Sequence, residues 1–475
     1  MANLNVLSDR YATDEMNSIW SDLEKTRRER RFWVEILKAE KQMGVDIPSP
    51  IIEAYESAID VDNRDAIREM EAELRHDIKA KIQGFSGAAG VNGYIHRPLT
   101  SRDLTDNVEQ WQIMDAAKLV FGKYVAILAA MDKKADAYAN ICLTARTHLQ
   151  PAQLTLLGRR FSMWEEELLE HLAPFEDFIR DYPMRGIKGP VGTQFDLLTL
   201  LGSSDKVDQM EAMVAESLGF SRVLHSTGQV YPRSLDYSLL AHLSQVASSV
   251  ENFANNMRLM ASSELVTEGF KEGQVGSSAM PHKMNTRTSE RVWGFAELLK
   301  MYADGGSRLS GAQLAEGDVS CSVVRRVILP DAFYASDGLC EAALTVFKEM
   351  GAYPAIISAE ADRYLPFLAT TEILNLAQTY GIDRETAHEV IKKHSIAAAL
   401  GMRKSGTPPD LSSDLAVDPI FAGAGISKSV LENLLQDREH FVGLALQQIG
   451  MVHDFAVPFF ERYPTQAAYQ PKDIL

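Results

Sequence analysis

The stretch LLAHLSQVASSVENFANNMRLM, Leu239–Met260, indicates the fold class of this chain of 475 residues. Seven of its apolar residues recur at alternating steps of four and three: Leu239, Leu243, Val246, Val250, Phe253, Met257 and Met260. This spacing keeps them on one face of a long helix that packs into a bundle. Such a stripe, rich in Met and Phe, is more typical of a bundle core than of a cofactor site.

The same spacing recurs earlier in the chain. Val120, Tyr124, Ile127 and Met131 form a second apolar stripe at helical steps. Between the predicted helices we find no long run of alternating apolar and polar residues and no hairpin turn. The sequence therefore predicts an all-α fold, and its long seams suggest helices that are shared with other subunits.

Two breaks divide the predicted helices. SGAAGVNGYIHRPLTSRDLTDN (Ser86–Asn107) is rich in Gly, Ser and Thr, and the chain turns again near Gly351–Pro354. We predict an N-terminal helical domain at residues 1–111, a central bundle of long helices at 112–364 and a C-terminal helical domain at 365–475.

Composition limits the classes of partner and compartment. The formal net charge of −17, from 65 acidic and 48 basic residues, disfavours nucleic acid and anionic membranes as partners. The one dense basic run, KTRRERRFW at Lys25–Trp33, we interpret as the solvated face of an early helix. Three cysteines without metal-like spacing, together with an N-terminus that lacks a signal pattern, predict a cytoplasmic protein.

Several familiar catalytic motifs are missing from the sequence. HEVIKKH (His388–His394) places its histidines six apart, hence on different helix faces, whereas a zinc helix needs a spacing of four. A Walker-type phosphate loop, a strand–GxGxxG–helix unit and a G-x-S-x-G elbow are also missing. Enzymes that hydrolyse nucleotides, transfer hydride or cleave esters with those motifs are therefore disfavoured.

Three polar segments remain, each at an end of a predicted long helix. They are HRPLTSRDLTDN (His96–Asn107), ARTHLQPAQ (Ala145–Gln153) and GSSAMPHKMN (Gly276–Asn285). A lone histidine or serine in such a segment most often makes an ordinary turn hydrogen bond. Three clusters at helix ends are harder to dismiss, because helix bundles assemble polar sites in this way.

GSSAMPHKMN resembles the signature G-S-S-x-M-P-x-K-x-N of the fumarase/aspartase superfamily, and the other two polar segments resemble its further conserved regions. Four more segments are similar to those of the adenylosuccinate lyase family: RYATDEMNSIWSD (Arg10–Asp22), LRHDIKA (Leu74–Ala80), GPVGTQ (Gly189–Gln194) and GQVYPR (Gly228–Arg233). The resemblance extends from about residue 10 to about residue 395.

The resemblance implies a three-domain all-α fold whose long central helices form the core of a homotetramer, with each active site shared by three chains. It implies elimination of fumarate from adenylosuccinate, giving AMP, and from the related succinyl carboxamide ribotide of purine synthesis. Neither a metal nor a cofactor is implied. Such a reaction needs a base, a group that holds the dianionic intermediate and an acid for the leaving nitrogen.

Residue by residue, the resemblance implies Ser277 as the base and His148 as the general acid. An imidazole suits the second role because its ordinary pKa lies near neutrality. Supporting positions match Ser278, Met280 and Glu290. Substrate-binding positions match Arg10, Tyr11, Arg75, His76, Asp77, Thr100, Ser101, Thr147, Gln229, Lys283, Asn285, Ser322 and Arg326.

Two departures from the family pattern bear on substrate binding. Gly317 stands where an arginine that contacts substrate is expected, and either Arg325 or Arg233 is a candidate to compensate. Thr286 replaces a common proline, a minor change because both residues can begin the following helix. The acid role also remains open to sharing between His148 and His76.

Alternative functions stay open at this point. One is another fumarate-releasing lyase or a cycloisomerase of the superfamily, for which Arg10, Tyr11 and the other phosphate-binding positions would have no use. Another is a non-catalytic scaffold of the kind found among lens crystallins, which the intact Ser277, Lys283 and His148 disfavour.

Overall fold

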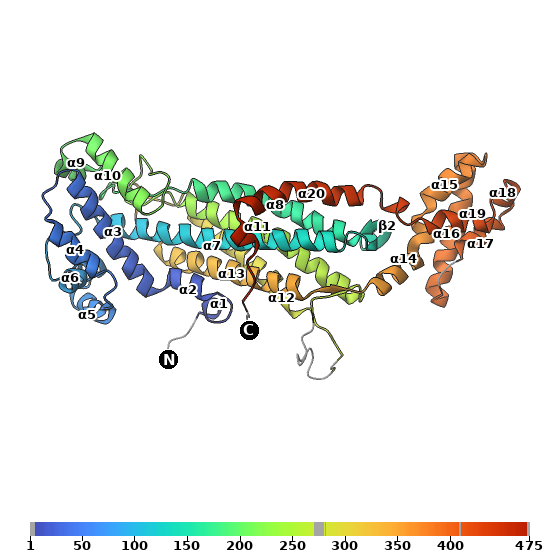
Figure 1. The fold of residues 1–475 in the computed structure, drawn as a ribbon, viewed down its shortest axis with the longest axis horizontal. Helices are drawn as coiled ribbons and strands as arrows, with labels where there is room; N and C mark the ends of the chain where they lie inside the picture. The colour runs from blue at the N-terminus through green and yellow to red at the C-terminus, as the bar shows by residue number, and fades with distance from the viewer. Residues whose placement is uncertain (1–4, 270–279, 281, 408–409, 473–475) are drawn as a thin grey trace.

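The computed structural model describes residues 5–269, 280, 282–407 and 410–472. Figure 1 shows an elongated molecule in which long helices run along the long axis and smaller groups of helices lie at either end. Within the described residues the four strands are short and everything else of regular structure is helical. The predicted all-α class is confirmed.

The first hundred residues build the helices at one end of the molecule. They are α1 (Val6–Arg10), α2 (Asp14–Trp20), α3 (Asp22–Gln42), α4 (Ser49–Ser57), α5 (Arg64–Leu74) and α6 (Asp77–Ala89). Two later helices, α9 (Phe195–Leu201) and α10 (Ser204–Ser217), lie at the same end, where α10 packs on α3 (Figure 1).

Five long helices form the central bundle, and the apolar stripes of the sequence lie inside it. They are α7 (Ser101–Ala137), α8 (Leu157–Arg180), α11 (Ser234–Ser262), α12 (Arg287–Leu309) and α13 (Ser322–Glu349). The seven stripe residues of α11 are at most 2% exposed, and the four of α7 are fully buried. Helix α11 packs against α8, α12 and α13. With 37 residues, α7 is about 55 Å long and spans the bundle.

The C-terminal part of the chain leaves the bundle and comes back. Helix α14 (Pro354–Leu368) leads to shorter helices: α15 (Thr370–Thr379), α16 (Arg384–Ser405), α17 (Leu411–Ala416), α18 (Pro419–Gly423), α19 (Lys428–Gln436) and the 3-10 helix η1 (His440–Val442). Then α20 (Ala445–Arg462) and α21 (Pro464–Ala467) return to pack on α7 (Figure 1). Residues 111 and 364, the predicted boundaries, fall inside α7 and α14, and the division into three domains stays a prediction.

The second polar segment forms a β-hairpin, contrary to the expectation that no hairpin was present. Strand β1 (Cys142–Thr147) pairs antiparallel with β2 (Gln150–Leu156), and His148 and Leu149 form the turn. Their φ angles are 50° and 61°, which residues other than glycine rarely adopt. The usual Asn-Gly or Asp-Gly signal is missing, so the local sequence did not indicate a turn. A second small pair joins β3 (Val266–Thr267) to β4 (Gly351–Ala352).

The basic run Lys25–Trp33 lies on α3, and its interpretation as a solvated face was wrong. Arg28 and Arg30 are buried. Arg28 donates a hydrogen bond to Asp115 of α7 at 2.7 Å, and Arg30 donates to two carbonyl oxygens that follow α4. The run therefore joins α3 to its neighbours. In the described part of the chain, no helix is both long and apolar enough to cross a membrane.

Candidate functional site

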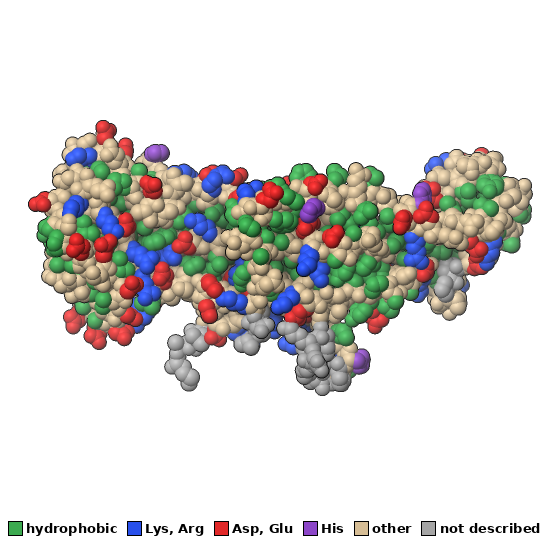
Figure 2. All heavy atoms as spheres, viewed as in Figure 1, with side chains coloured by type: hydrophobic (Ala, Val, Ile, Leu, Met, Phe, Trp, Pro, Cys, Tyr) green, Lys and Arg blue, Asp and Glu red, His purple; other side chains and the backbone are tan. Residues whose placement is uncertain are grey.

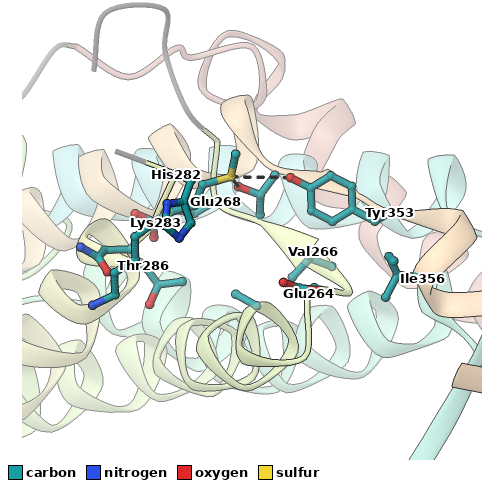
Figure 3. Close-up of a pocket in the computed structure, with 12 residues that line it drawn as sticks. Glu264, Val266, Glu268, His282, Lys283, Thr286, Tyr353 and Ile356 are labelled. Carbon is teal, nitrogen blue, oxygen red and sulfur yellow. Dashed lines mark hydrogen bonds between the residues drawn. The ribbon is translucent and has the colours of Figure 1, made fainter. Parts of the chain in front are cut away.

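The end of the segment that resembles the superfamily signature (Gly276–Asn285, called the signature segment below) forms one side of a pocket, or hollow, of about 480 Å³. Figure 3 shows His282, Lys283 and Thr286 on that side and Tyr353 and Ile356 on the other. His282 and Lys283 are exposed, as suits groups that meet a ligand. The predicted base, Ser277, and its neighbour Ser278 lie outside the described residues.

Glu268, which lies eight residues before Gly276, connects the chain ahead of the signature segment to the helix after it. Its carboxylate accepts hydrogen bonds from the backbone N–H groups of Thr288 and Ser289 and from the Ser289 hydroxyl, each at 2.9 Å. These N–H groups belong to the first turn of α12, where no carbonyl of the helix is available to them. Glu268 is only 8% exposed, so Lys283 and Asn285 lie on a segment whose two ends are fixed to each other.

Of three further predicted positions in this part of the chain, one lines the hollow. Asn285 is half-buried and lines the hollow beside Lys283. Met280 is exposed, and so is Glu290 in the first turn of α12. The supporting role of Glu290 stays a prediction.

The predicted acid, His148, lies at the tip of the hairpin with Thr147 beside it. Both side chains are exposed, and neither lines the hollow of Lys283. The left-handed backbone at His148 and Leu149 is an unfavourable conformation that the surroundings have to hold in place. The backbone of this turn sets the direction in which the His148 side chain leaves the hairpin.

Arg146 holds the hairpin turn from within β1. One guanidinium nitrogen donates to the Leu149 carbonyl oxygen at 3.2 Å, and another pairs with Glu360 of α14. The Tyr364 ring lies 5.7 Å from the guanidinium carbon, on the same helix. The sequence did not single out Arg146, because its function depends on contact with a helix more than two hundred residues away.

A second group of predicted residues lies at the opposite end of the bundle. An open hollow of about 790 Å³ is lined by Arg75, His76, Asp77, Ser101 and Arg326, and Ser322 lines an adjoining one with Arg326. The His76 Nδ1 accepts a hydrogen bond from the N–H of Lys79 at 3.3 Å, which leaves Nε2 to face a ligand.

Three cations in the second of these hollows were missed as site residues. Lys25, Lys81 and Arg102 line the hollow that holds Ser322 and Arg326. Figure 2 shows Lys and Arg side chains gathered where the N-terminal helices meet the bundle. The local positive charge of this end is consistent with binding of an anionic group, although the whole chain is acidic. Lys25 belongs to the basic run of α3, which was the one signal in the sequence.

Asp103 is the structural centre of this end. Its carboxylate accepts from the Thr100 N–H and hydroxyl, which caps α7, and from Arg185 at 2.6 Å. Two backbone N–H groups, those of Lys188 and Gly189, also donate to it. Asp103 and Arg185 are fully buried. Thr100 and Ser101 are thereby fixed against the 185–189 loop.

Neither arginine proposed to replace the one expected at Gly317 is available for that role. Arg233 is buried and pairs with Asp106 at 3.0 Å. Arg325 is buried and pairs with Asp236 at 2.6 Å and with Glu109 at 2.8 Å. Burial by itself would lower the pKa of Arg325, but the carboxylates around it raise that pKa well above its usual value. Both guanidinium groups are therefore already paired with carboxylates, although Arg325 also lines the hollow of Ser322 and Arg326.

The backbone explains why glycine stands at position 317. Gly317 has φ of 137°, and a Cβ there would lie 2.9 Å from the Val230 side chain. The same loop contacts Gln229, whose N–H donates to the Glu316 carbonyl oxygen at 2.6 Å. An arginine does not fit this loop in its present conformation, so the departure from the family pattern is part of how Gln229 is positioned.

Arg10 and Tyr11 lie apart from both hollows in the single chain. Arg10 is exposed at the end of α1. Tyr11 packs edge-on against Phe295 of α12, with ring centroids 5.1 Å apart. The predicted site residues therefore form separate groups, and Figure 1 shows the hairpin and α6 at opposite ends of the bundle.

A metal site is not evident in the described ranges, where no group of three or more His, Cys, Asp and Glu side chains could hold a metal ion. His394 of the HEVIKKH sequence instead hydrogen-bonds Asp418 at 2.9 Å, and His388 is exposed. The three cysteines are free.

Comparisons with known proteins give a consistent result. The sequence model of a family described as Lyase matches residues 35–297. The chain is 34% identical over 450 residues to the adenylosuccinate lyase of Saccharomyces cerevisiae, covering 93% of this chain and 92% of that protein. It is 32% identical to the adenylosuccinate lyase of Schistosoma mansoni, covering 94% and 93%.

Among solved structures, the chain resembles the 3-carboxy-cis,cis-muconate lactonizing enzyme of Pseudomonas putida, with a TM-score of 0.82. That match covers 96% of this chain and all of the other, at 19% sequence identity. An identity this low establishes the fold alone.

Proposed function

This chain belongs to the adenylosuccinate lyase family of carbon–nitrogen lyases, and from that membership we propose the reaction in detail. Adenylosuccinate is cleaved to AMP and fumarate, and the succinyl carboxamide ribotide of purine synthesis is cleaved in the same way. The observation that carries the proposal is the 34% identity over nearly the whole chain. The free cysteines agree with a cytoplasmic enzyme.

The chemical steps divide among four side chains. Ser277 removes the proton from the carbon next to a carboxylate of the succinyl group. Lys283 and Asn285 hold that carboxylate while it becomes a dianion, which is the largest electrostatic demand of the reaction. The C–N bond then breaks as the imidazolium of His148 gives its proton to the departing nitrogen. Thr100, Ser101 and Thr147 bind the succinyl carboxylates.

The nucleotide end of the substrate binds where the local charge is positive. His76, Ser322 and Arg326, with Arg10 and Tyr11, hold the phosphate. Lys25 lines the same region and adds a positive charge that the family pattern did not include, whereas Lys81 beside it pairs with Glu29 at 2.6 Å. An excess of local cations compensates for the net charge of −17, because counter-charges within a few ångströms outweigh distant ones.

A complete site combines residues of three chains in a homotetramer. Figure 1 shows the hairpin, which carries His148, and α6, beside the hollow of Arg326, at opposite ends of the bundle, and neither His148 nor Arg326 lines the hollow of Lys283. This separation within one chain supports the proposal, since one substrate cannot reach all three groups. Helices α12 and α13 also expose large apolar side chains in the single chain, among them Met301 at 66% and Val323 at 75%. Burial of such surface drives association of subunits.

The proposed reaction is tested by offering the purified protein adenylosuccinate, argininosuccinate and malate in parallel and following fumarate. We expect fumarate to be released from adenylosuccinate and from neither of the other two compounds. Turnover of argininosuccinate or malate instead would contradict the proposed substrate.

The shared site is tested by co-assembling His148→Ala with Arg326→Ala after each has been shown to be inactive. If the two residues of a site come from different chains, random mixing restores about a quarter of the sites. If they come from one chain, the mixture stays inactive, and that result would contradict the assembly.

A further inference from the structure

The two ends of the chain meet on one buried group of charges. In Figure 1, α1, α2 and the end of the chain lie on the same side of the bundle. Beneath them, Lys123 of α7 forms ion pairs with Asp337 and Glu341 of α13, at 2.6 Å for Glu341. The side chains of all three are at most 4% exposed.

Asp337 holds the N-terminal segment just after Arg10 and Tyr11. Its Oδ2 accepts from the Thr13 N–H at 2.6 Å and from the Thr13 hydroxyl at 2.9 Å. The next residue of α13 is Gly338, and a Cβ there would lie 2.9 Å from the Cβ of Tyr11. The turn that follows α1 is therefore fixed directly against α13.

Glu341 holds the C-terminal segment in the same way. Its Oε1 accepts from the Tyr469 hydroxyl at 2.6 Å, and its Oε2 accepts from the Lys472 N–H at 2.7 Å. The ring of Tyr469 also lies 5.3 Å from the Lys123 nitrogen. Lys472 then reaches the N-terminal segment itself, with its ammonium group 2.6 Å from a carboxylate oxygen of Glu15.

These contacts couple the N-terminal and C-terminal segments of the chain through one shared cation, Lys123. A buried carboxylate is stable only when its oxygens are paired and hydrogen-bonded. Without the C-terminal segment, Glu341 would lose both the Tyr469 and the Lys472 donor and would depend on Lys123 alone. Lys123 is also the partner of Asp337, so a shift of Lys123 toward Glu341 weakens the group that holds Thr13.

We propose that residues 469–472 are a positioning element for substrate binding. Through Glu341, Lys123 and Asp337 they fix the turn that carries Arg10 and Tyr11. This inference rests on the proposed function, in which Arg10 and Tyr11 bind the substrate phosphate. Tyr469 is a positioning residue and does not touch the substrate.

The test compares Tyr469→Phe with Tyr463→Phe. Tyr463 also donates from its hydroxyl to a glutamate at 2.6 Å, but its partner is Glu176 of α8. For Tyr469→Phe we expect KM for adenylosuccinate to rise about three- to tenfold with little change in kcat, because a hydrogen bond to a buried charge is lost. Amide hydrogen exchange should quicken in residues 5–20. Tyr463→Phe should match the wild type in both measurements.

Lys472→Met is a second variant, since it removes an exposed ion pair and leaves the buried group in place. It should show the same pattern with a smaller rise in KM.

Arg10→Ala separates failure of the inference from failure of the proposed function. If it leaves KM unchanged, the phosphate assignment fails, and the inference fails with it. If Arg10→Ala raises KM but Tyr469→Phe changes neither KM nor exchange, only the inference is overturned. Equal effects of Tyr469→Phe and Tyr463→Phe would also overturn it, since they would indicate a general loosening of the chain.

Discussion

The two ends of the bundle differ in how some of their candidate site residues are held, although Arg75, His76 and Arg326 near α6 are exposed like His148. Near α6, Asp103 is fully buried with Arg185, and together they fix Thr100 and Ser101 before any ligand arrives. At the hairpin and the signature segment, His148 and Lys283 are exposed. Thr100 and Ser101 are thus prepared within one chain. In the assembly that we propose, other chains exclude water from the end that carries the proton transfers, which strengthens the charges that act there.

The largest effect should come from removing the proposed acid or base. For His148→Ala and Ser277→Ala we expect kcat to fall by about a thousandfold, because each removes a group that moves a proton in the transition state. The free energy of unfolding should stay near that of the wild type for His148→Ala, since the imidazole is exposed. Steady-state kinetics and urea unfolding measure the two quantities. A variant that keeps its rate would contradict the assigned role.

At the end near α6, a substitution should lower the stability of the fold. Asp103→Asn places an amide where Arg185 and backbone N–H groups donate, so we expect a loss of about 3 kcal/mol in the free energy of unfolding. Asp115→Asn is the matched control: its pair with Arg28 is partly exposed, with Asp115 at 31%, and should contribute less than about 1 kcal/mol. Urea unfolding of both variants gives the comparison. Equal losses would mean that burial does not distinguish the two pairs.

The regularity of the helices explains how much of the fold could be predicted. Leu239 and Val250 repeat at the helical period, and a long helix requires no information beyond that local pattern. The hairpin was missed because its turn residues, His148 and Leu149, carry no local turn signal and hold positive φ angles. Contacts with α14 stabilise that turn, and local sequence does not encode them.

The candidate site could be predicted only in part, because local motifs indicate some of its residues and long-range contacts bring in the others. Motif resemblance indicated Arg326, His76 and Lys283, each of which lines a hollow. Lys81, which the motifs do not include, was found only when α3, α6, α7 and α13 came together around one hollow. The basic run of α3 was misinterpreted because helical spacing gives no indication of which neighbours cover a helix face.

Gly317 tests whether the binding end tolerates the residue that the family pattern expects. We expect Gly317→Arg to lower the free energy of unfolding by about 2 kcal/mol, from the strained φ and the contact with Val230. KM should not improve, because the loop that holds Gln229 must move. Gly311→Arg is the control, since Gly311 also has positive φ, 78°, but a Cβ there meets open space. A lower KM for Gly317→Arg would show that the arginine can be restored.

A substitution of Arg146 tests how the turn that carries His148 is held in place, without changing the group that donates the proton. Lysine has no second nitrogen with which to reach both the Leu149 carbonyl and Glu360, so Arg146→Lys should loosen the turn that presents His148. We expect kcat to fall about tenfold with KM and unfolding nearly unchanged, because a small misplacement of an acid slows proton transfer more than binding. Arg159→Lys is the control, since the partners of Arg159 among the described residues are Gln448 and Met163, both in exposed contacts. An unchanged kcat for Arg146→Lys would mean that the strained turn holds its shape without the guanidinium. The position of His148 would then be fixed within one chain, as the positions of Thr100 and Ser101 are near α6.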